Sequence, residues 1–155
     1  DLAADRLEIL NGVPLEVTGE VNGEAVGIGK AGSLKAPVPL DAFADQVKAA
    51  FGLPFLLMYG SDAVKEPISR VAVSPGAGGS MIRYALEKKV QVLVTGDIGH
   101  HDAIDAAASG MAILDAGHYG LEHIFIQHMA EVLREKLKGE AALVLAEPAW
   151  PSVLL

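Results

Sequence analysis

Cysteine is absent from this sequence of 155 residues, and aromatic side chains make up only 5% of it. The lack of cysteine excludes disulfide bonds, thiolate catalysis and zinc sites with sulfur ligands. Any bound metal must therefore be held by histidine, aspartate, glutamate, backbone carbonyls or water. A chain without disulfides is compatible with the reducing cytoplasm, which is the location we expect.

Positive charge is also scarce, with 12 Lys and Arg against 20 Asp and Glu, for a formal net charge of −8. Binding to a nucleic-acid backbone is carried by Lys and Arg, and the few basic residues here are scattered along the chain. The composition therefore argues against a nucleic-acid partner.

Long hydrophobic runs are missing as well, although 51% of the residues are hydrophobic. No apolar run reaches the roughly 20 residues that a membrane-spanning helix requires, so we expect no membrane partner. The N-terminus lacks the basic-then-apolar layout of a signal peptide. The chain begins at Asp1 without a methionine, so we expect a fragment of a longer protein. Its length suits one aliphatic domain over residues 1–155.

Short apolar runs alternate with amphipathic helical patterns along most of the chain. Residues 12–24 read as a loop with at most one strand. Strands are expected at 25–34, 54–59, 68–74, 92–95, 111–114 and 141–146, and helices at 40–51, 81–89, 102–109 and 121–138. This alternation predicts an α/β fold: a three-layer-like domain with a mixed, mostly parallel sheet flanked by helices. Chemistry in such folds gathers at the carboxyl ends of the strands.

The first candidate pair is His118 and Glu122, at the start of the last predicted helix. A spacing of four places both side chains on one helix face, one turn apart. An imidazole and a carboxylate so placed can bind one divalent metal ion, and the glutamate can reach a second. The alternative is structural: Glu122 favours the positive end of the helix and His118 lies near its N-cap.

The second candidate is the segment GDIGHHD at residues 96–102, directly after a buried strand. Asp97 can ligate a metal or orient a histidine, and His100 or His101 can donate a proton or bind a phosphate. The alternative makes Asp97 or Asp102 a helix cap beside two solvated histidines.

Two further features carry less chemistry. The turn SPGAGGS at residues 74–80 either cradles an anion with its N–H groups or is a tight strand-to-helix connection, and it matches neither the P-loop nor the dinucleotide pattern. A nucleotide-binding Rossmann-like domain that uses this turn is a third, weaker hypothesis. Trp150 lies between two prolines and is interpreted as a packed tail rather than as a cofactor contact.

Five segments in order carry a resemblance to a known family: GIGKAG, LKAPVPLDAFADQVKAAFG, AVSPGAGGS, VTGDIGHHDA and ILDAGHYGLE. Together they resemble the C-terminal half of the Nif-three-like dinuclear metal-centre family, whose members are also named GTP cyclohydrolase 1 type 2 homologs. The resemblance runs from near Asp1 to about Leu145. The ordered succession is far more specific than any one segment.

The resemblance implies roles for particular residues. His118 and Glu122 match the family's Gly-His-x-x-x-Glu element as metal ligands, with the glutamate bridging. Asp97 and His101 match an element beside the metals and are expected to be catalytic, as substrate or proton-transfer groups. His100 stands where relatives often carry an aromatic side chain. The family fold has two similar α/β lobes facing each other across the metals, of which this chain is one, and commonly forms a hexameric ring of dimers.

The resemblance also implies what this chain lacks. The family's other ligands, a His-His pair and an aspartate, belong to an N-terminal lobe that is not in the chain. We therefore expect two divalent ions (Zn, Fe, Mn or Mg) in the complete site, and weak or no metal binding by the chain alone. The implied function is a metal-dependent hydrolase, of cyclohydrolase or phosphoesterase type, acting on a nucleotide or phosphoester. The alternative is a non-catalytic metal-binding or protein-interaction module.

Overall fold

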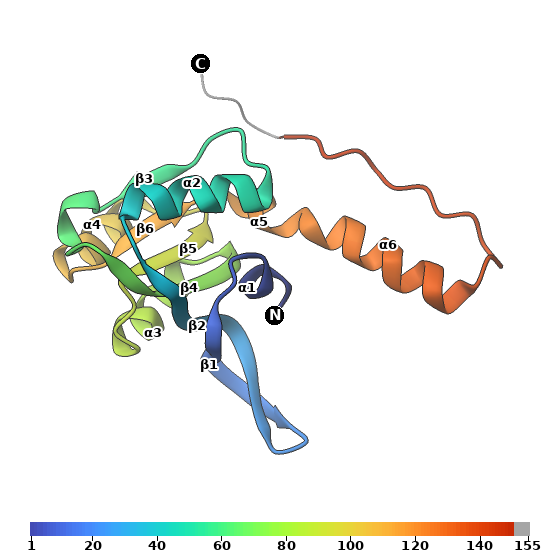
Figure 1. The fold of residues 1–155 in the computed structure, drawn as a ribbon, viewed down its shortest axis with the longest axis horizontal. Helices are drawn as coiled ribbons and strands as arrows, with labels where there is room; N and C mark the ends of the chain where they lie inside the picture. Colours follow the sequence, from blue (N-terminus) through green and yellow to red (C-terminus); the bar gives the residue numbers. More distant parts are fainter. Residues whose placement is uncertain (151–155) are drawn as a thin grey trace.

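A computed structural model describes residues 1–150, and a six-stranded mixed sheet forms its centre (Figure 1). The strands are β1 (Leu10–Val21), β2 (Glu24–Val38), β3 (Leu57–Tyr59), β4 (Ile68–Ala77), β5 (Val92–Gly96) and β6 (Ala112–Asp115). The helices are α1 (Leu2–Arg6), α2 (Leu40–Phe51), η1 (Ser61–Ala63), η2 (Gly79–Met81), α3 (Ile82–Glu87), α4 (His100–Ala108), α5 (His118–Glu122) and α6 (Ile124–Leu137).

The strand order is β1-β2-β4-β5-β6-β3. Only β4, β5 and β6 are parallel, while the β1–β2 hairpin and β3 join them antiparallel. The mixed α/β sheet is therefore confirmed, but its parallel part is smaller than predicted. Parallel neighbours end at the same edge, so the loops after β5 and β6 lie side by side.

Helices cover both faces of the central strands, which confirms the three-layer arrangement. Alternate strand side chains point to opposite faces. Val71, Val73 and Val94 pack with the buried residues of α1 and α2. Ala72 and Leu93 pack on the other face, against the buried residues of α3.

The N-terminal hairpin differs from the prediction, because residues 12–24 form most of β1 and its turn rather than a loop. Asn22 and Gly23 both have positive φ (53° and 83°), as a two-residue hairpin turn requires. Residues 17–28 are exposed on both faces of the hairpin, which projects from the body (Figure 1). Since neither face of the hairpin is buried there, residues 17–28 show no regular alternation of hydrophobic and polar side chains.

The C-terminal part differs in two ways. The helix predicted at 121–138 is divided at His123 into α5 and α6, and its end is the left-handed Lys138 (φ 46°) just before Gly139. The strand predicted at 141–146 is wrong: this segment is extended but unpaired, and Val144 is 94% exposed. β3 already occupies the place beside β6 at that edge of the sheet.

Within residues 1–150, none of the helices combines the length and the apolar character needed to cross a bilayer.

Candidate functional site

Asp115 joins the two loops at the carboxyl edge of the parallel strands. Its side chain is buried, with 7% of the residue exposed. Its carboxylate accepts hydrogen bonds from the backbone N–H groups of Asp97 (3.1 Å), Ile98 (3.0 Å) and Gly117 (2.8 Å). Sequence reasoning assigned Asp115 no role, although an aspartate that ends a buried apolar strand is a usable signal. It fixes the positions from which the site residues project.

His118 lies between two carboxylates. Its ring Nδ1 is 3.0 Å from Oδ2 of Asp97, and its backbone N–H donates to Oδ1 of the same residue at 3.2 Å. On the other side of the ring, Nε2 is 3.3 Å from Oε2 of Glu122. The three side chains are 43–54% exposed, so the group opens to solvent. The structure thus brings together three of the four site residues named from the sequence.

The hydrogen bonds of the His118 ring determine which of its nitrogens is available to bind a cation. A carboxylate can only accept, so Nδ1 carries the proton that is donated to Asp97. In the neutral ring, Nε2 faces the Glu122 carboxylate with its lone pair, 3.3 Å away; in the imidazolium, Nε2 donates its N–H to that carboxylate. Two electron-rich groups at this distance are stabilised by a shared cation, either a proton or a metal ion. A carboxylate that holds the far nitrogen is the usual second layer around a metal-bound histidine.

The donor set fits half of a metal site. Within residues 1–150, no group of three or more His, Asp or Glu side chains is placed to hold a metal ion. His118 and Glu122 therefore offer two direct ligands, with Asp97 behind the histidine. Zinc takes four ligands, and magnesium or calcium takes six or more, so this chain alone is not expected to enclose an ion.

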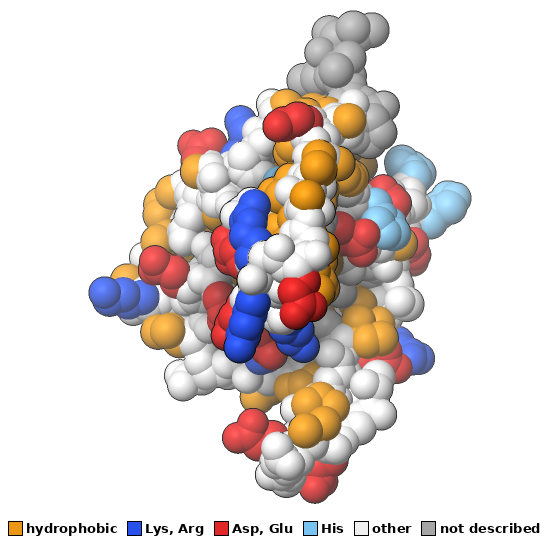
Figure 2. Space-filling view, turned by 90° about the vertical axis from the view of Figure 1, so that its right-hand side faces the viewer, with side chains coloured by type: hydrophobic (Ala, Val, Ile, Leu, Met, Phe, Trp, Pro, Cys, Tyr) orange, Lys and Arg blue, Asp and Glu red, His pale blue; other side chains and the backbone are white. Residues whose placement is uncertain are grey.

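His100 and His101 stand apart from this group, in the first turn of α4. Both are exposed, and their rings contact each other with centroids 5.5 Å apart. The N-cap of α4 is Gly99, without a side-chain cap hydrogen bond, so the interpretation of Asp97 or Asp102 as its cap is wrong. Figure 2 shows histidine side chains gathered beside acidic ones at one edge of the molecule.

The glycine-rich turn forms a wall of the site, and the tight-connection interpretation is the one the structure supports. β4 runs on to Ala77, and the N–H of Gly78 donates to the carbonyl of Gly96 at 3.0 Å. Gly76 is buried with φ 85°, and a Cβ there would lie 3.3 Å from Oε1 of Glu122 and 3.6 Å from Nε2 of His118. The lack of a side chain at this position leaves room for the pair.

A methyl group at Gly96 is expected to push the two loops apart. Its Cβ would lie 2.4 Å from the carbonyl carbon of Gly117 and 2.6 Å from the backbone nitrogen of His118. Both contacts are with backbone, so Gly96→Ala should lower the free energy of unfolding by about 1–3 kcal/mol, as overpacking does. Urea denaturation measures this. Gly19→Ala is the control, because its nearest contact would be 3.7 Å away; equal stability of the two variants would contradict the prediction.

Comparison with known proteins decides the family. Residues 1–147 match the family described as Duf34/NIF3 (NGG1p interacting factor 3). The chain belongs to this family. It is 41% identical over 111 residues to a "GTP cyclohydrolase 1 type 2 homolog" of Streptococcus pneumoniae, covering 70% of this chain and 41% of that protein. A protein of the same name from Pyrococcus abyssi is 35% identical over 130 residues, covering 84% of this chain and 50% of the relative.

Solved structures of similar proteins share the fold. A Bacillus cereus protein related to NIF3 superposes with a TM-score of 0.70 at 28% identity, covering 86% of this chain and 37% of that one. The protein ybgI, described as of unknown function, gives a TM-score of 0.67 at 30% identity, covering 85% and 49%. The chain therefore spans half or less of the length of these four proteins.

Proposed function

We propose that His118 and Glu122 are ligands of a divalent metal centre in a hydrolase that acts on a nucleotide or phosphoester. One observation carries the proposal: Asp97 holds Nδ1 of His118 at 3.0 Å while Nε2 faces the Glu122 carboxylate at 3.3 Å. The name of the curated relatives, "GTP cyclohydrolase 1 type 2 homolog", supports hydrolysis of a nucleotide.

Each side chain has a distinct part in this proposal. When bound, a pair of divalent ions polarises the substrate and lowers the pKa of a bound water to near neutrality. Glu122, through its carboxylate, and His118, through Nε2, would hold the metal. Asp97 keeps the imidazole in the correct tautomer and orientation. His101, exposed in the first turn of α4, is the proposed proton donor.

We infer that the remaining protein ligands come from outside this chain. Two donors are fewer than any of the candidate metals requires. We infer that another part of the whole protein, or a second copy, faces the carboxyl edge and completes the site. This inference agrees with the relatives' greater length, since the chain covers 41% and 50% of two of them.

Asp97→Asn tests the proposal in the whole protein. An asparagine cannot accept a charge-assisted hydrogen bond from Nδ1, so His118 loses its fixed orientation and basicity. We expect about 10–100-fold weaker metal binding, as for other second-layer partners of metal ligands, with a parallel loss of GTP or phosphoester hydrolysis. Calorimetric metal titration and a product assay with and without chelator measure both quantities.

Asp105→Asn is the matched control, because Asp105 is an exposed aspartate on α4. Unchanged metal affinity in Asp97→Asn, or equal losses in both variants, would refute the site. Tight metal binding without turnover of any substrate would favour the second candidate function, a non-catalytic interaction module. One observation favours that candidate: α6 exposes Phe125 (43%), Met129 (48%) and Leu133 (37%) on one side.

A further inference from the structure

A cavity of about 410 Å³ opens beside His118, on the side where Asp97 lies. Its size falls in the range of small-molecule sites, about 300–1,000 Å³. Three parts of the chain line it: the segment 54–57 before β3, the loop 115–120 after β6, and Trp150. The pairing of Leu57 with Asp115 in the β3–β6 ladder holds the first two of these parts together.

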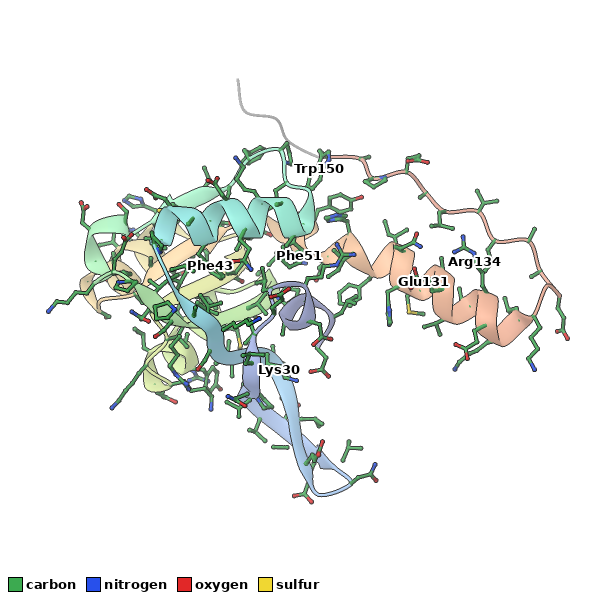
Figure 3. All side chains as sticks on the ribbon, viewed as in Figure 1. Lys30, Phe43, Phe51, Glu131, Arg134 and Trp150 are labelled. Atoms are coloured by element: carbon green, nitrogen blue, oxygen red, sulfur yellow. The ribbon has the colours of Figure 1, made fainter. Side chains whose placement is uncertain are left out.

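The walls of the cavity are mainly aromatic and apolar. Phe55, Tyr119 and Trp150 lie around it, in a protein whose sequence contains few aromatic residues. The Trp150 ring makes edge contacts with the rings of Tyr119 (centroids 5.6 Å apart) and His123 (5.3 Å). The backbone N–H of Ala149 donates to the Tyr119 hydroxyl at 3.3 Å. Figure 3 shows Trp150 where the C-terminal segment returns toward the body of the molecule.

One end of the cavity is polar, and it borders the proposed metal site at the Asp97 side of the His118 ring. Asp97 and His118 lie there, whereas the Asp115 carboxylate is already used by three backbone N–H groups. Gly117 contributes open space, since a Cβ built on it meets nothing within 4 Å. A ligand that fits must therefore be flat and apolar along the aromatic walls and polar at one end.

We propose that this cavity binds the base of a nucleotide, with the sugar-phosphate end directed toward His118. Stacking on aromatic side chains suits a nucleobase, because every base has a π-face. The orientation rests on the proposed function, but recognition of the base depends only on the aromatic walls. The cavity thereby makes a nucleotide the substrate class, in preference to a simple phosphoester.

Metal-free titration tests base recognition separately from the metal site. Trp150 is the single tryptophan of the sequence, so its fluorescence reports directly on the cavity. In the presence of EDTA, guanosine and GMP should quench this fluorescence saturably, and ribose 5-phosphate should not. Phe55→Ala should weaken guanosine binding by about tenfold or more, the usual cost of losing one stacking partner.

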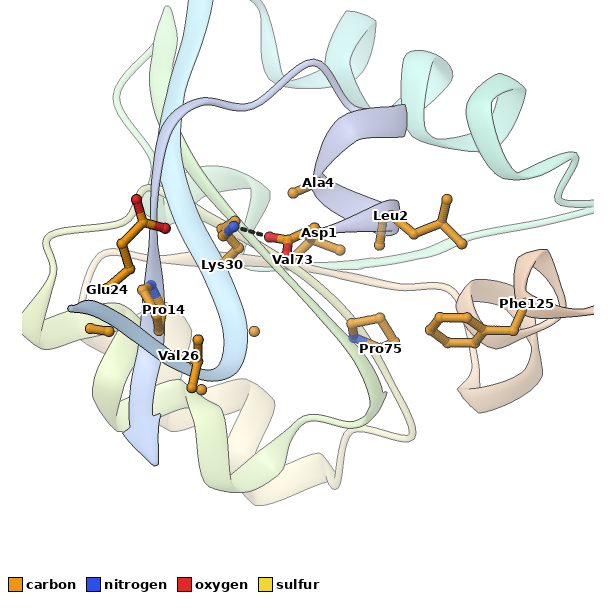
Figure 4. A pocket seen from close by; sticks show the side chains of 14 residues that line it. Asp1, Leu2, Ala4, Pro14, Glu24, Val26, Lys30, Val73, Pro75 and Phe125 are labelled. Carbon is orange, nitrogen blue, oxygen red and sulfur yellow. Dashed lines mark hydrogen bonds and ion pairs between the residues drawn. The ribbon is translucent and has the colours of Figure 1, made fainter. Parts of the chain in front are cut away.

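Phe125→Ala is the matched control. Phe125 is 43% exposed on α6 and lines a different cavity, next to Pro75 (Figure 4). This variant should bind guanosine as the unchanged chain does, while Trp150→Ala, followed by calorimetry, should bind it more weakly. No guanosine binding, equal binding of ribose 5-phosphate, or equal effects of Phe55→Ala and Phe125→Ala would each overturn the proposal. If guanosine binding fails while the metal content is normal, the proposed metal site still stands. If guanosine binds normally but metal does not, only the metal site is refuted.

Discussion

Replacing Asp115 with alanine is expected to lower the free energy of unfolding by about 3–5 kcal/mol, because three backbone donors lose their acceptor and each unpaired buried donor costs about 1–3 kcal/mol. The carboxylate accepts three backbone hydrogen bonds, from Asp97, Ile98 and Gly117, at 2.8–3.1 Å. Alanine leaves these donors without their acceptor at a position where only 7% of the residue is exposed. Urea denaturation followed by circular dichroism measures the loss.

Asp115→Ala should also separate the two loops that carry the site. Metal affinity should therefore fall together with the free energy of unfolding. Asp115→Asn retains one acceptor oxygen and should be intermediate. Asp45→Ala, at an exposed position of α2, is the control and should change stability by less than about 0.5 kcal/mol. If Asp115→Ala were as stable as this control, the claim that Asp115 organises the site would be wrong.

His118→Ala is expected to have the largest effect on metal binding. In the whole protein, it removes a direct ligand, so affinity should fall by about a hundredfold or more, beyond the 10–100-fold typical of outer partners. Stability should change little, because the His118 side chain is 50% exposed. Metal analysis after dialysis and calorimetric titration measure the change.

His128→Ala supplies the comparison for this prediction, since His128 is an exposed histidine on α6. It should retain the metal fully. Equal metal contents in the two variants would show that the imidazole at residue 118 is not a ligand.

Much of the central fold follows from local sequence patterns. Leu40, Phe43, Val47 and Phe51 recur at helical spacing, and all are buried in α2, which has the predicted bounds and is followed by the left-handed Gly52 (φ 60°). The short apolar runs at β4, β5 and β6 were recognisable because parallel strands are buried on both faces. Helices and strands that bury their apolar side chains in the hydrophobic core can therefore be predicted from the sequence.

The arrangement of the site required two geometric rules together. Helical spacing places His118 and Glu122 on one face, and parallel strands bring the loop that holds Asp97 to the same edge. The sequence could not distinguish whether Asp97 would bind a metal or orient a histidine. The observed contact with Nδ1 of His118 supports the orienting role. His101 remains a prediction, because its exposed ring makes no contact that tests it.

The aromatic cavity could not be predicted, because its walls are distant in the sequence. Phe55 precedes an edge strand, Tyr119 is in α5, and Trp150 follows a segment that has no strand partner. Trp150 was correctly interpreted as a packed tail, since its ring lies against Tyr119 and His123. No local pattern, however, indicates that these rings surround an open space beside His118.

The central claim is that the ring of His118, together with Glu122, presents an open metal-binding edge. Titration of the chain with Mn²⁺, followed by NMR of its five histidine rings, tests it most directly, because paramagnetic broadening detects even weak binding. We predict that the His118 resonances broaden first and that Asp97→Asn raises the Mn²⁺ concentration required. Broadening that begins at His128, or that spares His118 altogether, would contradict the account.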